Sequence, residues 1–266
     1  MSSADTTSAD TIIAALRTGH DGLVTLVAGF GDADLTRPSA ASEWDISQVL
    51  SHLGSGAEIM RGTFREALGG PDPDRESNEA IWDRWNARSP RERADSFVES
   101  NRILVELLES LDAGRREELR VDLGFLPAPV DVATAGRMRL SEFALHAWDV
   151  RAALDPAATL APEAVPPLLH DTALLGWISK PEALDGAHST VEVTTTAPAE
   201  VFTLRLEEPV GVEFEAPEKS QGALALPAEA WLRLVAGRLS PEHTPAEATA
   251  TGTADLDVLR RVFPGY

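Results

Sequence analysis

The chain has 266 residues, 43% of them hydrophobic, which is enough to form the cores of two globular domains. Its formal net charge of −20 argues against nucleic acid or an anionic membrane as a partner, because phosphate binding needs clustered Lys and Arg. The sequence has no cysteine, which excludes disulfides, thiolate metal sites and a protein-borne thiol nucleophile.

The first ten residues are rich in Ser, Thr and Asp and have neither a basic start nor an apolar core. A secretory signal needs both of these features, so we expect a cytoplasmic protein. No stretch approaches the roughly 18 consecutive apolar residues of a membrane helix, so we expect no membrane partner.

Apolar residues that recur at helical spacing predict four amphipathic helices in the first part of the chain. The second helix has a strong start signal, because Asp45 and Gln48 have the spacing of a capping box. A long connection over residues 113–135 precedes the last helix, and such a connection is usually functional or covers something. Four helices with one long crossover are typical of a four-helix bundle. The predicted ranges are 8–30, 45–69, 78–111 with a break at Ser89-Pro90, and 136–154.

At Asp155-Pro156 the pattern changes to shorter elements with strand-like alternation, which predicts a small α+β domain. We therefore expect two domains, a four-helix bundle over residues 1–155 and an α+β domain over residues 156–266. The predicted strands are 190–196, 201–207, 210–215, 223–226 and 246–251, and the predicted helices are 163–179, 227–239 and 255–263.

Glu142 and His146 lie four residues apart on the last predicted bundle helix, so they share one face. His52 lies in the first two turns of the second helix, which can face the last helix in a bundle. Two histidines and one carboxylate form an open catalytic zinc site when water completes the coordination, and they also suit other divalent metals. A lone helical histidine is more often structural, however, and a Glu/His pair is more often solvated. Spacing alone favours that plainer interpretation.

Several residues around the pair carry weaker expectations. Asp149 either accepts a hydrogen bond from a histidine or pairs with Arg139 or Arg151. Trp44 and Trp148 are expected in the core. The remaining histidines are expected to be structural or exposed: His20, His170, His188 and His243.

Segments in both predicted domains resemble a known family. Residues 43–53, Glu-Trp-Asp-Ile-Ser-Gln-Val-Leu-Ser-His-Leu, resemble the signature of the DinB-like bundle superfamily. Residues 136–151 are similar to the E-x-x-x-H-x-W-D segment of its mycothiol-dependent maleylpyruvate isomerase branch. Residues 226–239 and 259–265 resemble the sterol-carrier-like second domain of that branch. The resemblance spans nearly the whole chain.

The resemblance implies a zinc ion held by His52, Glu142 and His146. In such enzymes the metal binds the thiol of mycothiol and lowers its pKa, and the thiolate then attacks an electrophilic carbon. In the isomerase it adds to the maleyl double bond, allows rotation and leaves; in relatives the thiol is transferred. An arginine of the second domain assists catalysis, which implies Arg238, with Arg233 as the competitor, for binding a substrate carboxylate.

We therefore expect a metal-dependent isomerase or S-transferase that uses a mycothiol-like thiol on a small, carboxylate-bearing electrophile. Substrate and thiol would bind between the two domains, with residues 113–135 in the wall, and the protein would be a monomer or homodimer. One alternative is a non-catalytic small-molecule binding module, because a fold does not determine a function. Another is a metal-dependent hydrolase in which the same ligands activate water.

Overall fold

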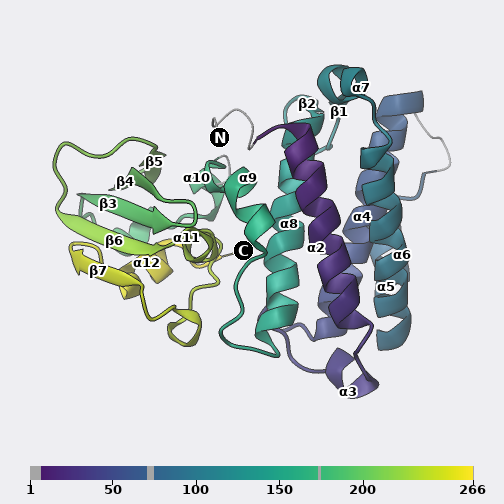
Figure 1. The fold of residues 1–266 in the computed structure, drawn as a ribbon, viewed down its shortest axis with the longest axis horizontal. Helices are drawn as coiled ribbons and strands as arrows, with labels where there is room; N and C mark the ends of the chain where they lie inside the picture. Colours follow the sequence, from purple (N-terminus) through teal and green to yellow (C-terminus); the bar gives the residue numbers. More distant parts are fainter. Residues whose placement is uncertain (1–6, 71–74, 173–174, 266) are drawn as a thin grey trace. The chain divides into compact units, whose positions relative to one another are not determined.

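The computed structural model describes residues 7–70, 75–172 and 175–265. The chain forms two compact units, Met1–Leu154 and Asp155–Tyr266. The first unit is built from helices, and the second is built around a β-sheet (Figure 1). This arrangement confirms the predicted fold class of a helical bundle followed by an α+β domain.

Four long helices form the core of the first unit. The second of them, α4, packs against α6 and α8, and α2 packs against the same two helices, which gives a four-helix bundle. Each helix buries an apolar stripe in the common core. No described helix has the length and apolar character needed to cross a membrane. The bounds are α2 (Ala9–Val27), α4 (Ile46–Gly69), α6 (Pro90–Glu109) and α8 (Val132–Ala152).

Side-chain caps fix where α4 and α6 begin. The backbone N–H of Gln48 donates to Asp45 Oδ1 at 2.8 Å, and the backbone N–H of Asp45 donates to Gln48 Oε1 at 2.9 Å. Ser89 and Glu92 form the same reciprocal box at the start of α6, with Pro90 at the first helical position. The predicted break at Ser89-Pro90 is therefore confirmed, because the region contains two helices, α5 (Asn78–Asn86) and α6.

The long predicted connection between α6 and α8 contains regular structure. Helix α7 (Ala113–Glu118) is followed by an antiparallel pair of two-residue strands, β1 (Arg120–Val121) and β2 (Val130–Asp131). Helix α8 begins four residues earlier than predicted, because Asp131 caps it by accepting a hydrogen bond from the Thr134 N–H at 2.7 Å. A further short helix, α3 (Asp32–Leu35), follows α2.

The second unit contains a five-stranded sheet in the order β5-β4-β3-β6-β7. Strand β3 pairs with β6 in parallel, and the other pairs are antiparallel. Helix α11 packs on this sheet, where the Trp231 ring meets the Phe202 ring at 5.1 Å between centroids. The bounds are β3 (Ser189–Thr196), β4 (Glu200–Leu206), β5 (Gly211–Glu213), β6 (Gly222–Pro227), β7 (Thr249–Gly252), α11 (Ala228–Val235) and α12 (Leu256–Val262).

The prediction of one helix over residues 163–179 was wrong. The segment forms a 3-10 turn (Pro162–Ala164), α9 (Val165–Leu169) and α10 (Leu175–Ile178), and residues 173–174 lie outside the described part. Prolines 166 and 167 lack the N–H that a helix interior needs, so they suit only a first helical turn. The short helix that they begin ends before His170, which pairs with Glu200 of β4 at 2.7 Å.

Candidate metal centre

The structure brings together the three side chains that the resemblance implied as ligands. His52 lies in the second turn of α4, and Glu142 and His146 lie one turn apart on α8. One ligand atom from each lies within 4.8 Å of the other two. His52 Nε2 is 3.2 Å from Glu142 Oε2, and His146 Nε2 is 3.7 Å from the same oxygen. The two imidazole rings meet edge to face with 4.7 Å between their centroids.

These separations suit a small divalent cation. Zinc bonds to nitrogen and oxygen at about 2.0–2.1 Å in tetrahedral geometry, which places neighbouring ligand atoms roughly 3.3 Å apart. The separations of the two histidine nitrogens from Glu142 Oε2, 3.2 and 3.7 Å, lie on either side of that value. All three ligand atoms lie within 4.8 Å of one another, so the three side chains are close enough to converge on one ion.

A fourth residue orients His146. The ring is buried, and its Nδ1 is 2.8 Å from Oδ2 of Asp149, a fully buried carboxylate three residues further along α8. Because a carboxylate only accepts hydrogen bonds, Nδ1 is the donor. In the neutral ring, Nε2 then carries a lone pair that faces an oxygen of Glu142. Two acceptors that face each other repel unless a proton or a cation lies between them. With a cation at Nε2, Asp149 and His146 would form the carboxylate–histidine–metal pattern. This contact confirms the first of the two expectations for Asp149.

Glu142 is ionised at neutral pH. Burial raises the pKa of its carboxyl, but the hydrogen bond with His52 and the charges of His146, His52 and Arg139 outweigh burial and lower the pKa to about 2. The side chains of His52 and Glu142 are 37% and 38% exposed, so the centre opens to solvent on that side. It can hold a cation and still admit a small molecule.

Trp44 lies against both histidines, which corrects the expectation of a core residue. Its ring centroid is 5.2 Å from that of His52 and 5.9 Å from that of His146, and the side chain is only partly buried. The preceding residue, Glu43, has a φ of 69°, a strained value for a residue other than glycine. Trp148, by contrast, is a core residue with 1% exposure. Since Trp44 belongs to the loop before α4, no helical spacing indicated its place.

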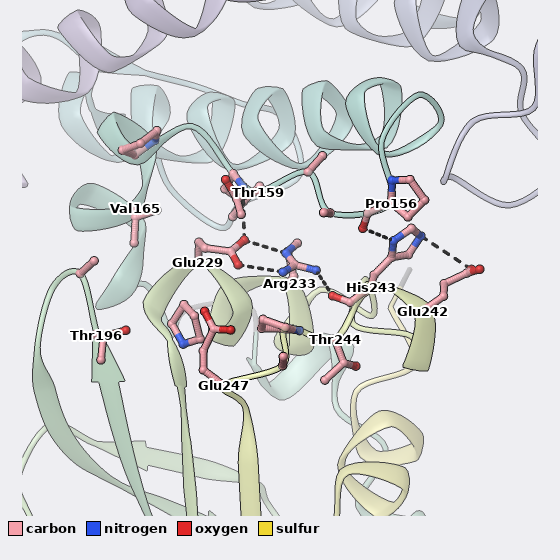
Figure 2. A pocket seen from close by; sticks show the side chains of 18 residues that line it. Pro156, Thr159, Val165, Thr196, Glu229, Arg233, Glu242, His243, Thr244 and Glu247 are labelled. Atoms are coloured by element: carbon pink, nitrogen blue, oxygen red, sulfur yellow. Dashed lines mark hydrogen bonds and ion pairs between the residues drawn. The ribbon is translucent and has the colours of Figure 1, made fainter.

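The two candidate arginines of the second unit have different surroundings. Arg233 lines a cavity of about 680 Å³ and is buried, with Nε and Nη2 donating to Glu229 at 2.7 and 2.8 Å (Figure 2). Its Nη1 donates to the carbonyl of His243 at 2.8 Å. Arg238, the expected catalytic arginine, is partly buried, and its Nη1 donates to the carbonyl of Ala236 at 3.0 Å. Arg233 therefore stabilises the cavity wall, and nothing in these contacts assigns a role to Arg238.

Among the described residues, the other four histidines do not belong to this group of ligands, and each has a partner that the sequence did not reveal; Nδ1 of His188 is 3.9 Å from Oε2 of Glu207. His20 is buried beside Asn101, and His170 pairs with Glu200. His243 contacts the carbonyl of Pro156 at 3.0 Å in the wall of the cavity (Figure 2).

The sequence and the fold are similar to known proteins. A family described as "Mycothiol maleylpyruvate isomerase N-terminal domain" matches residues 16–151. No curated protein matches the sequence. The crystal structure of the mycothiol-dependent maleylpyruvate isomerase is similar, with a TM-score of 0.61 and 15% identity over 93% of this chain and 94% of that one. A histidine-to-alanine mutant of that isomerase gives a TM-score of 0.61 and 14% identity over the same shares. At these identities the likeness establishes the fold.

Proposed function

The chain belongs to the mycothiol maleylpyruvate isomerase N-terminal domain family, and from that premise we propose that it is a metal-dependent, thiol-using enzyme. It isomerises a small electrophile that bears a carboxylate, or transfers a thiol to it, with mycothiol or a similar low-molecular-weight thiol as cosubstrate. The arrangement of His52, Glu142 and His146 around one point, with Asp149 behind His146, carries this proposal.

The donor set fits zinc or another divalent transition metal, since it combines two imidazoles with an ionised carboxylate. His52, Glu142 and His146 would hold the ion. Three protein ligands leave a coordination position open, as in catalytic zinc sites. When bound, the metal supplies a Lewis acid that lowers the pKa of a thiol reaching that position.

The chain's own residues prepare the site for this chemistry. Asp149 holds the proton on Nδ1 of His146 and so keeps Nε2 available as a ligand atom. Trp44 covers one side of both imidazoles, which leaves less room for water there. The half-exposed sides of His52 and Glu142 provide the approach for thiol and electrophile.

For an isomerisation, the thiolate sulfur forms a bond to one alkene carbon while the π electron pair moves to the conjugated carbonyl oxygen. The former double bond then rotates, the electron pair returns, and the carbon–sulfur bond breaks to release the thiolate. No proton or electron is gained or lost overall. A guanidinium that binds the substrate carboxylate keeps one end fixed during rotation, and we propose Arg238 for this role.

Metal content tests the ligand assignment. The purified chain should hold about one divalent metal ion per molecule by elemental analysis, and His52→Ala and His146→Ala should each lose most of it. His188→Ala is the matched control, because that histidine is 69% exposed and lies in the other unit. Full retention of metal by both ligand variants would overturn the assignment.

A turnover assay tests the chemistry. Maleylpyruvate should be isomerised only when both mycothiol and metal are present. Turnover of an electrophile panel without any thiol would favour the metal-dependent hydrolase instead. A metal-loaded protein that shows no turnover under either condition would favour the non-catalytic binding module.

A further inference from the structure

A buried chain of hydrogen bonds links all four long helices of the bundle. Arg139 on α8 is 4% exposed, and its Nη2 donates to the carbonyl of Leu53 on α4 and to Oδ1 of Asn101 on α6, both at 2.8 Å. The amide Nδ2 of Asn101, which is fully buried, lies 3.0 Å from Nδ1 of His20 on α2 and donates to it. Each long helix therefore contributes one group.

These hydrogen bonds reach the parts of α4 and α8 that carry the candidate ligands. Leu53 is the residue directly after His52, so a bond to its carbonyl holds α4 at the level of that ligand. Arg139 precedes Glu142 by three residues and His146 by seven, so the three side chains share one face of α8. The guanidinium thus connects α8 to α4 at the height where the ligands of the two helices face each other.

The directions of its hydrogen bonds, and not packing, account for an arginine at this position. A charged group in a bundle core is costly, and an apolar side chain of similar size would fill the space with less penalty. Helix α4 makes room for the group at Gly56, where an added Cβ would lie 3.0 Å from Nη1 of Arg139. A planar guanidinium can reach a carbonyl on one helix and an amide on another in fixed directions, whereas the point charge of lysine cannot.

We propose that Arg139 is a positioning residue for the metal centre: through Leu53 and Asn101 it fixes the separation of α4 and α8, so that His52 stands opposite Glu142. The inference rests on the proposed function, because the separation of the three side chains matters for activity only if they hold a metal. Arg139 itself is not one of the three candidate ligands.

Cobalt binding to the full-length chain tests this role. Co²⁺ suits such a donor set, and its visible absorption reports the geometry of the ligands. In the variants Arg139→Met and Asn101→Ala, the Co²⁺ affinity should fall tenfold or more, as for other groups that support metal ligands, and the absorption bands should shift. The Co²⁺ affinity of Arg139→Lys should lie between that of these variants and that of the unaltered chain. Lysine keeps the positive charge and loses the planar set of donors of the guanidinium.

Ser100→Ala is the matched control. The Ser100 hydroxyl is buried and donates to the carbonyl of Gly54 at 2.8 Å, so it also joins α6 to α4, but within the described residues it forms no hydrogen bond with α8. This variant should unfold at a lower temperature and keep its Co²⁺ affinity within about twofold, since it breaks a buried hydrogen bond between α6 and α4 at the same level and leaves the link to α8 intact.

The outcomes distinguish a positioning role of Arg139 from a purely structural one. If Asn101→Ala and the arginine variants unfold at lower temperature but bind Co²⁺ with unaltered affinity and bands, Arg139 is only structural and the inference is overturned. If Arg139→Met does not fold, Arg139→Lys and Asn101→Ala decide the question. If the unaltered chain binds no divalent metal at all, the proposed function and this inference fall together.

Discussion

At the scale of single residues, the side chains of the candidate metal centre hold one another in place. His146 is held through Nδ1 by Asp149, and its Nε2 faces Glu142. Trp44 lies over it and over His52. A ring that is fixed on three sides is already oriented for coordination, and little conformational entropy remains to be lost on binding an ion.

Replacing Asp149 with asparagine should weaken this orientation. The neutral amide accepts a weaker hydrogen bond than the carboxylate and can turn its NH₂ group toward Nδ1, so we expect the affinity for Zn²⁺ to fall about tenfold. Calorimetric titration of the metal-free protein would measure the change. A Zn²⁺ affinity equal to that of the unaltered chain would show that Asp149 has no part in holding the ligand.

Buried His20 should make the stability of the protein depend on pH. Burial lowers the pKa of His20 below the ordinary 6.5, and Asp21 opposes this only in part. Above pH 6.5 the ring is neutral in both the folded and the unfolded chain, so its contribution to stability is fully present. As the pH falls below that value, the unfolded chain takes up a proton first, and stability is lost toward the folded pKa.

Melting temperatures recorded from about pH 7.5 down to about pH 5.5 should therefore fall less steeply for His20→Gln than for the unaltered chain. The exposed His188, changed in the same way, is the control and should leave the slope as it is. An identical pH dependence for the His20 variant would contradict this account.

The residues of this centre were only partly predictable. Glu142 and His146 share a helical face by spacing, but only the resemblance implies that they are ligands, because an isolated pair at that spacing is usually solvated. Arg139 has the same spacing signal, three residues before Glu142, but the sequence indicates it only as a possible partner for Asp149. Asn101 had no signal, since its role depends on how α6 packs against α4 and α8.

At the scale of elements, the start of α4 deserves a test because it sets the height of His52. Asp45 accepts a hydrogen bond from the Gln48 N–H and another from the Ser47 hydroxyl at 2.7 Å. In Asp45→Ala these donors lose their partner, so the free energy of unfolding should drop by about 1 kcal/mol in urea titrations. Asp45→Asn, which keeps a capping oxygen, should retain most of that stability; equal losses in both variants would argue against the cap.

Elements with strong local signals were predicted well. The capping pattern at Asp45 placed the start of α4, and Gly69-Gly70-Pro71 ended the predicted helix where α4 ends, at Gly69. The prediction failed over residues 163–179, where apolar spacing suggested one helix and the two prolines limited it. The early start of α8 was also missed, because the cap at Asp131 lies in a stretch without periodicity.

At the scale of the whole molecule, the candidate ligands all belong to the helical unit. A bound ion stabilises the state that holds it by RT ln(1 + [L]/Kd), about 2.7 kcal/mol when the metal is at 100 times its Kd. Hydrogen–deuterium exchange should therefore show slower exchange in peptides from α4 and α8 on adding Zn²⁺, and little change in β3 and β6.

His146→Ala is the control for that measurement, because it removes one ligand and should abolish the protection. Slower exchange spread evenly over both units, or none in the helical unit, would contradict a site confined to the bundle. The change of pattern at Asp155-Pro156 predicts a domain boundary, whereas nothing in the sequence indicates the order of the strands, because strand order depends on pairing between distant segments.

The fluorescence of the Trp44 indole should report metal binding. Its centroid lies within 6 Å of both imidazoles, so an ion held between them would be a near neighbour of a fluorophore that is built into the chain. A paramagnetic ion such as Co²⁺ quenches indole emission at that range, and Zn²⁺ does not. The difference in emission between the unaltered chain and Trp44→Phe would isolate this one tryptophan among the six. Loading and exchange of the metal could then be followed in real time without any added label.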